Sequence, residues 1–279
     1  MKTILIPTER QESMKAALHT ALLLARRFDS YIEGFALQAG LRDMVTVDMG
    51  GGLPLDSFKQ DSIEEANKTK QMFEAFMQEH GVPRASQASS KLSFGWMDDA
   101  PDGEGAVGSC GRVFDVIVLR RLDDGSTGLH HRALESGLFE SGRPILLSPP
   151  TPPRQIGTNI MVHWNCSTEQ ARATAFAMPL LHKAQRVIVL NVVGGQSVLG
   201  PSAEQLLAYL KRNGVAAESM SVELEGRSTG EAVLASAKSQ DCDLLIKGAY
   251  TQSRLRQWIF GGATRHILAN AMLPVLMAH

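Results

Sequence analysis

The chain has 279 residues, of which 44% are hydrophobic and 20% charged, and its formal net charge is −1. This balance is typical of a globular protein of two ordinary domains and excludes a disordered chain. With so small a net charge, the field of the whole molecule would attract neither nucleic acid nor an anionic membrane. No apolar run reaches the roughly 20 residues that span a bilayer. The three cysteines are too few and too widely spaced for a disulfide framework. Because the first residues also lack the apolar core of a signal peptide, we expect a cytoplasmic protein without nucleic-acid or membrane partners.

Short apolar runs alternate with amphipathic segments through the first half. A helix capped by Ser13 is expected to end near Phe28, and Gly81 is expected to terminate the next long helix. The expected strands are 2–8, 31–37, 92–96, 115–119 and 144–147, and the expected helices are 16–28, 56–80, 106–113 and 131–141.

Four prolines within residues 149–153 interrupt this pattern and indicate a stiff, extended linker. The same order then returns, with Ser202 as a helix cap and Gly214 as a helix stop. The expected strands are 159–164, 186–190, 215–222, 243–246 and 274–277, and the expected helices are 168–183, 203–213, 229–239 and 264–270.

The two halves are also similar in amino-acid sequence at corresponding strands. Residues 114–118 match 242–246 at the fourth strand, and residues 143–146 match 273–276 at the fifth. Short apolar strands alternating with helices predict α/β domains with parallel sheets covered on both faces. We therefore expect two doubly wound, five-stranded domains, 1–150 and 151–279, that form a pseudo-twofold tandem. The fifth strands of the two halves are expected to pair with each other as exposed edges.

Residues 247–265 form the segment with the clearest chemical character. Glycines allow the backbone to approach a ligand closely, and the helix expected to follow adds unpaired N–H donors at its N-terminus. The only charged residues of this segment are Lys247, Arg254, Arg256 and Arg265, so its local field is positive. This combination predicts an anion site, and phosphate is the natural ligand.

The segment resembles the signature of the universal stress protein family: a glycine, two residues, a second glycine, nine residues, and a glycine followed by serine or threonine. Gly248 and Gly261 stand at the first and third glycines with the correct spacing. Thr251 replaces the second glycine, and Gly262 stands where the hydroxyl residue is expected. The resemblance is strongest in the last ~40 residues and covers the whole chain in outline.

The resemblance implies a Rossmann-like fold of the adenine-nucleotide α-hydrolase type, with ATP or a related adenine nucleotide bound in the second domain. It places the phosphates on this loop and the adenine and ribose at the ends of the first two strands of that domain. The implied binding residues are Val162, His163, Trp164, Asn165, Val192, Gly248, Thr251, Arg254, Gly261, Gly262, Ala263 and Thr264. Magnesium is expected only together with a bound triphosphate.

Two departures leave alternatives open. Thr251 reaches a positive φ only at a cost, although its hydroxyl can instead donate to phosphate. Gly262 lacks the hydroxyl group that the signature has at this position, and Thr264 carries a hydroxyl group two residues later. A helix-entry loop that packs Trp258 and binds nothing is the alternative to a phosphate site. At the level of function, the alternatives to a nucleotide-binding regulatory or interaction module are a nucleotide-free structural dimerisation protein and a slow ATP hydrolase.

The corresponding segment of the first half, 119–132, does not fit the signature spacing, and Asp123 and Asp124 would repel phosphate. Glu9 lies near the position where the family carries an acidic residue, but we expect this first site to be degenerate. Adjacent His130 and His131 do not share a helix face and are expected to be exposed loop residues rather than metal ligands. We find no set of residues in a catalytic pattern, so we expect at most slow ATP hydrolysis as an enzymatic activity. A homodimer of the tandem chain remains a further option for assembly.

Overall fold

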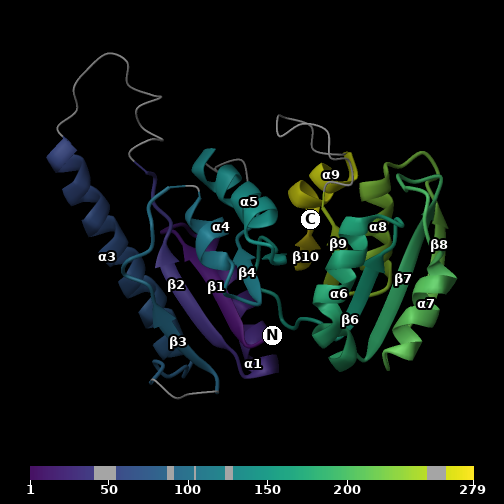
Figure 1. Ribbon diagram of the computed structural model, residues 1–279, viewed down its shortest axis with the longest axis horizontal. Coiled ribbons are helices and arrows are strands. Elements are labelled where there is room, and N and C mark those ends of the chain that lie inside the picture. Colours follow the sequence, from purple (N-terminus) through teal and green to yellow (C-terminus); the bar gives the residue numbers. More distant parts are fainter. Residues whose placement is uncertain (41–54, 87–90, 104, 123–127, 250–261) are drawn as a thin grey trace, which may run out of the picture. The chain divides into compact units, whose positions relative to one another are not determined.

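The computed structural model describes residues 1–40, 55–86, 91–103, 105–122, 128–249 and 262–279 (Figure 1). The chain divides into two compact units, Met1–Arg143 and Pro144–His279. The division falls just before strand β5 (Ile145–Leu147), whereas the proline-rich linker placed the expected boundary near residue 150. β5 groups with the second unit because it pairs antiparallel with β10 (Val275–Ala278), so that Leu146 lies opposite Leu276. The expected pairing of the two fifth strands is confirmed.

The first unit holds four parallel strands in the order β3-β2-β1-β4, with helices between them. Helix α1 packs against the central strands, and α4 packs against α5. The strands are β1 (Thr3–Thr8), β2 (Tyr31–Ala36), β3 (Ser93–Trp96) and β4 (Val116–Leu119), and the helices are α1 (Met14–Phe28), α3 (Leu55–Glu79), α4 (Ala106–Gly111) and α5 (Gly128–Glu140).

The second unit contains the doubly wound sheet expected from the sequence. Its strands follow the order β5-β10-β9-β6-β7-β8, and all except β5 run parallel to their neighbours. The remaining strands are β6 (Asn159–His163), β7 (Arg186–Val193), β8 (Glu218–Glu223) and β9 (Leu244–Gly248), and the helices are α6 (Thr168–Lys183), α7 (Ala203–Arg212), α8 (Thr229–Ser239) and α9 (Gly262–Asn270).

Strand order reverses between β6 and β9 in this unit. From β6 the chain proceeds outward through β7 to β8, and it then returns to the other side of β6 for β9 and β10. The carboxyl ends of β6 and β9 therefore meet at a topological switch point, the place where open α/β sheets bind ligands.

Several helices have the ends expected from the sequence, because residues close to those ends determine where a helix begins and stops. Helices α6 and α8 begin and end where the sequence predicts, and Ser202 caps α7 by accepting a hydrogen bond from the backbone N–H of Gln205. Ser13 precedes α1, but its side chain makes no capping hydrogen bond, so that part of the prediction is wrong. The backbone of Ser13 is already helical, and a helical residue does not direct its hydroxyl at the next turn as an extended cap residue does.

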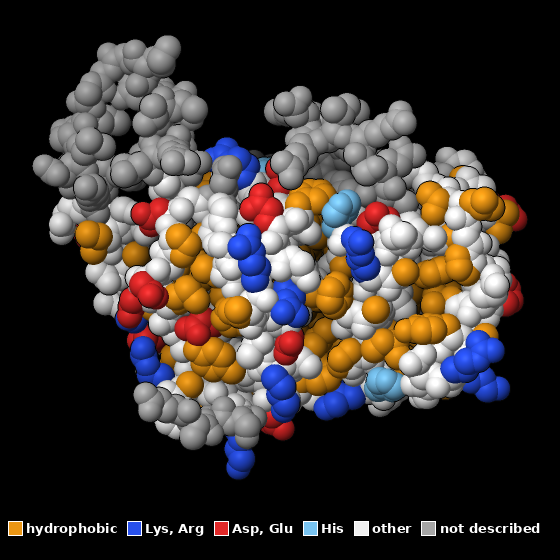
Figure 2. All heavy atoms as spheres, in the orientation of Figure 1, with side chains coloured by type: hydrophobic (Ala, Val, Ile, Leu, Met, Phe, Trp, Pro, Cys, Tyr) orange, Lys and Arg blue, Asp and Glu red, His pale blue; other side chains and the backbone are white. Residues whose placement is uncertain are grey.

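The core is apolar, and the surface carries charges of both signs. The central strands β1, β4, β6 and β9 are almost entirely buried, and most of their residues are aliphatic, as expected for parallel strands covered on both faces. Figure 2 shows acidic and basic side chains interspersed on the face in view, in keeping with a net charge close to zero. No helix in the described ranges has the length and apolar character needed to cross a membrane.

Candidate functional site

The candidate site lies at the switch point of the second unit. β6 ends at His163 and β9 ends at Gly248, while α6 and α9 begin nearby at Thr168 and Gly262. Within the expected set, Thr251, Arg254 and Gly261 lie outside the described residues, as does Arg256. The described part of the site therefore consists of the strand ends and the first turns of the two helices.

Gly248 allows α6 to approach β9 closely. A Cβ atom at this position would lie 2.4 Å from the backbone nitrogen of Gln170, in the first turn of α6. The Gly248 N–H donates to Oε1 of Gln170 over 2.6 Å, and the Gln170 N–H donates to the capping Oγ of Ser167 over 3.1 Å. The first glycine of the signature therefore has a packing role that is independent of any ligand.

Lys247, one residue earlier, has an ammonium group enclosed by protein. Its Nζ donates to the carbonyl of Gly248 over 2.8 Å and to Oγ1 of Thr264 over 2.9 Å, and the residue is only 3% exposed. Burial lowers the pKa of Lys247 from its ordinary value of 10.5 to about 8, because the charged form loses its hydration. Since side chains alternate along a strand, Gly248 faces α6 and Lys247 faces α9. The Lys247–Thr264 hydrogen bond thus ties the first turn of α9 to the end of β9.

His163 is a second buried titratable residue at the site. Its pKa is lowered to about 3, first by burial and then by the positive charge of Lys247 on the neighbouring strand. Its Nδ1 atom is buried without a hydrogen-bond partner in the described part of the chain. The imidazole is therefore neutral at physiological pH, and Lys247 carries the positive charge.

The other expected residues on β6 and β7 are held by the fold. Val162 and Val192 are buried in their strands, while the indole N–H of Trp164 donates to the carbonyl of Pro201 over 2.8 Å. Oδ1 of Asn165 accepts a hydrogen bond from the backbone N–H of Ser167 over 3.3 Å. These contacts order the segment that leads from β6 into α6.

Residues in the first turn of α9 differ from one another in solvent exposure. Gly262 is exposed, with open space around the position of a Cβ atom, whereas Ala263 and Thr264 are buried. A helix N-terminus carries unpaired N–H groups and the positive end of the helix dipole, so this turn favours an anion.

Sequence reasoning missed two residues of this arrangement. Lys247 was expected as one of several charges on a phosphate loop, but it belongs to β9 and is buried. Gln170 was not singled out at all. The available signal for Lys247 was its place directly after three aliphatic residues of a buried strand, where an exposed charge is unusual.

In the first unit, a charged side chain occupies the position that corresponds to Gly248. Ile4 pairs with Val116 as Ile160 pairs with Leu244, so counting along the strands places Arg120 at the position of Gly248. Nε of Arg120 lies 2.7 Å from Oε2 of Glu9, and Arg120 is only 1% exposed. A large paired side chain thus stands where the second unit has no side chain.

His130 completes this cluster, and the expectation that it is an exposed loop residue is wrong. It is buried in α5, and its Nδ1 lies 3.2 Å from Oε2 of Glu9. The helix begins at Gly128, three residues earlier than expected, which carries His130 into the interior. Burial raises the pKa of Glu9, but the hydrogen bonds and charges of His130 and Arg120 outweigh it and leave that pKa lowered.

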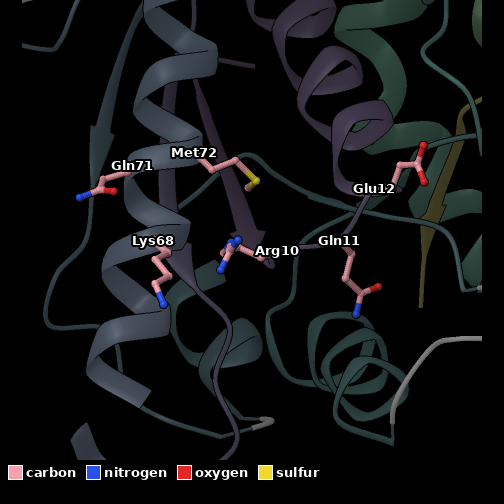
Figure 3. A pocket seen from close by; sticks show the side chains of 6 residues that line it. All are labelled: Arg10, Gln11, Glu12, Lys68, Gln71 and Met72. Carbon is pink, nitrogen blue, oxygen red and sulfur yellow. The ribbon is translucent and has the colours of Figure 1, made fainter. Parts of the chain in front are cut away.

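An open hollow of about 570 Å³ also lies in the first unit, between the start of α1 and the helix α3. Figure 3 shows that its side chains do not converge on one point, and the Arg10 guanidinium is paired with Glu65 at 3.2 Å. The lining residues are Arg10, Gln11, Glu12, Lys68, Gln71 and Met72. This arrangement lacks the convergent polar groups of a binding site.

Comparison with known proteins agrees with this architecture. Residues 158–279 match the model of the Universal stress protein family, and no curated protein sequence matches the chain. The chain is similar to a solved structure of a universal stress protein from Archaeoglobus fulgidus DSM 4304, with a TM-score of 0.73, 13% identity, and 99% of this chain and 97% of that one covered. It is also similar to a protein from Pseudomonas aeruginosa UCBPP-PA14, with a TM-score of 0.52, 16% identity, and 100% and 93% covered. At these identities the structural likeness establishes the fold of the whole chain.

Proposed function

We propose, from the premise that residues 158–279 form a domain of the universal stress protein family, that this domain binds an adenine nucleotide, ATP or a close relative. The protein then acts in a stress response as a cytoplasmic regulatory or interaction module whose state depends on that nucleotide. The phosphates are assigned to the first turn of α9 and the preceding loop, and the adenine and ribose to the ends of β6 and β7.

The observation that carries this proposal is the junction between β9 and α9. The hydrogen bond from Lys247 to Thr264 holds the exposed start of α9 directly at the carboxyl end of β9. The helix dipole, the backbone N–H groups of the first turn and a hydroxyl therefore lie at the switch point of the sheet, which is the arrangement that phosphate groups prefer.

The first unit is proposed to bind no nucleotide. The Glu9–Arg120–His130 cluster stands at the strand ends that would receive a ligand, and its charges already satisfy one another. A phosphate would have to displace the carboxylate of Glu9 from Arg120, and separating a buried ion pair is costly.

A nucleotide-free structural role is the second candidate. One specific observation favours it: the close contact between Gly248 and Gln170 requires glycine whether or not a ligand is present. The signature glycine is therefore compatible with a domain that has lost its ligand and retained its packing.

The proposal is tested by purifying the protein without added nucleotide, denaturing it and measuring the released small molecules by mass spectrometry. We expect one adenine nucleotide for each chain at most, and a much smaller amount from the double variant Arg254→Ala/Arg256→Ala. The double variant Lys211→Ala/Arg212→Ala removes the same charge from the exposed end of α7 and should retain the nucleotide. Absence of nucleotide in the wild type, together with no binding of added ATP, would favour the structural role.

A further inference from the structure

Among the residues that the structure describes, Lys247 is a buried cation whose hydrogen-bond acceptors are neutral oxygens. Its two hydrogen-bond partners are the carbonyl of Gly248 and the hydroxyl of Thr264, and within the described ranges no carboxylate forms an ion pair with it. A buried charge normally requires an opposite charge or a full set of hydrogen bonds. Lys247 therefore has an unmet preference for an anion.

The geometry also determines the role of the Thr264 hydroxyl. An ammonium group can only donate, so Oγ1 of Thr264 must accept the hydrogen bond from Lys247. The hydroxyl proton of Thr264 then points away from Lys247, and the described residues provide no acceptor for it. Thr264 lies in the first turn of α9, beside backbone N–H groups that have no partner within the helix itself.

His163 does not compensate for the charge of Lys247. Its imidazole is neutral at physiological pH and can supply no negative charge. The positive end of the α9 dipole has the same sign as the ammonium, so the two reinforce each other toward an anion.

We propose that Lys247 is a positioning residue for the phosphate groups of the ligand, acting through Thr264. Its ammonium fixes Thr264 Oγ1 as an acceptor, directs the Thr264 hydroxyl proton at a phosphate oxygen, and places positive charge beneath the start of α9. The inference rests on the proposed nucleotide function and specifies how this chain distinguishes phosphorylated from unphosphorylated ligands.

The test is titration calorimetry of the full-length protein with ATP, ADP and adenosine. Lys247→Met keeps the length of the side chain without the charge, and Thr264→Val keeps the shape without the hydroxyl. Each is expected to weaken ATP binding about tenfold, the effect of one charge-assisted hydrogen bond, and to leave adenosine binding within about twofold. Thr264→Ser retains the hydroxyl and is expected to bind ATP like the wild type. Lys211→Met is the control, because it removes one exposed lysine from α7.

The double variant Lys247→Met/Thr264→Val separates a coupled pair from two independent contacts. If Lys247 acts through Thr264, the double variant loses little more ATP affinity than the weaker-binding single variant. Equal ATP affinity of the wild type and Lys247→Met, or a parallel loss for adenosine, would overturn the inference and leave the proposed function intact. No binding of any of the three ligands by the wild type would contradict the proposed function and the inference together.

Discussion

Replacing Lys247 with methionine should change how the stability of the protein depends on pH. The pKa of Lys247 is lowered from 10.5 to about 8 by burial, so the folded protein holds this proton less firmly than the unfolded chain. Between these two values the unfolded chain binds more protons, and the stability of the wild type rises with pH. Below pH 8 the lysine is charged in both states, and the full cost of burying the charge is present. Methionine carries no charge and has no such dependence.

The size of the effect follows from the pKa change. A fall from 10.5 to about 8 corresponds to about 3 kcal/mol over the whole range, of which about 2 kcal/mol appears between pH 7 and pH 9.5. Loss of the hydrogen bond to the Gly248 carbonyl costs the variant about 1–3 kcal/mol, but this offset does not depend on pH. His163, with a pKa of about 3, is neutral throughout this interval and contributes nothing to the change.

Urea unfolding at pH 7 and pH 9.5 measures the effect directly. The free energy of unfolding of the wild type, relative to Lys247→Met, should increase by about 2 kcal/mol between the two pH values. Lys211→Met is the matched control, and its difference from the wild type should remain constant because Lys211 is exposed. A wild-type-to-Lys247→Met difference that is equal at both pH values would show that the ammonium is not buried as described.

Three further substitutions test packing or backbone strain near the ends of β9, β1 and β6. Gly248→Ala should destabilise the protein by about 1–3 kcal/mol, because the new Cβ meets the Gln170 backbone at 2.4 Å; an unchanged denaturation midpoint would contradict that contact. Glu9→Gln should cost about 3 kcal/mol at pH 7, measured by urea unfolding, because it removes the Glu9 carboxylate from its ion pair with the buried Arg120; a loss below 1 kcal/mol would mean that water reaches the cluster. Cys166→Gly should stabilise the protein by about 0.5–1 kcal/mol, since Cys166 has a φ of 64°; a lower thermal midpoint would show that its side-chain contacts outweigh the strain.

The sequence was sufficient for the elements whose signals are local. Ser202 with Gln205, and Ser228 with Glu231, form capping boxes that mark the starts of α7 and α8, and such pairs are visible in the sequence because they lie three residues apart. The repeated order of apolar strands and helices likewise predicted a doubly wound sheet, because strand burial on both faces requires continuous aliphatic runs.

The chemistry of the site depended on long-range packing that the sequence does not display. Lys247 contacts Thr264 of α9, which lies seventeen residues later in the sequence. His130 contacts Glu9, which lies more than a hundred residues earlier. The role of Gly248 is a further example, since the element that excludes a side chain there is the first turn of α6. Residue types indicated phosphate chemistry, whereas the partners of each residue emerged only from the fold.

We expect each chain to bind one adenine nucleotide, through the second unit. Titration calorimetry of the full-length protein with ATP tests it most directly, because the stoichiometry counts the sites and Arg254→Ala/Arg256→Ala assigns them. The expected stoichiometry is near one, with binding weakened in that variant. A stoichiometry near two would show that the Glu9–Arg120–His130 cluster opens to admit a ligand, and no detectable binding would contradict the claim.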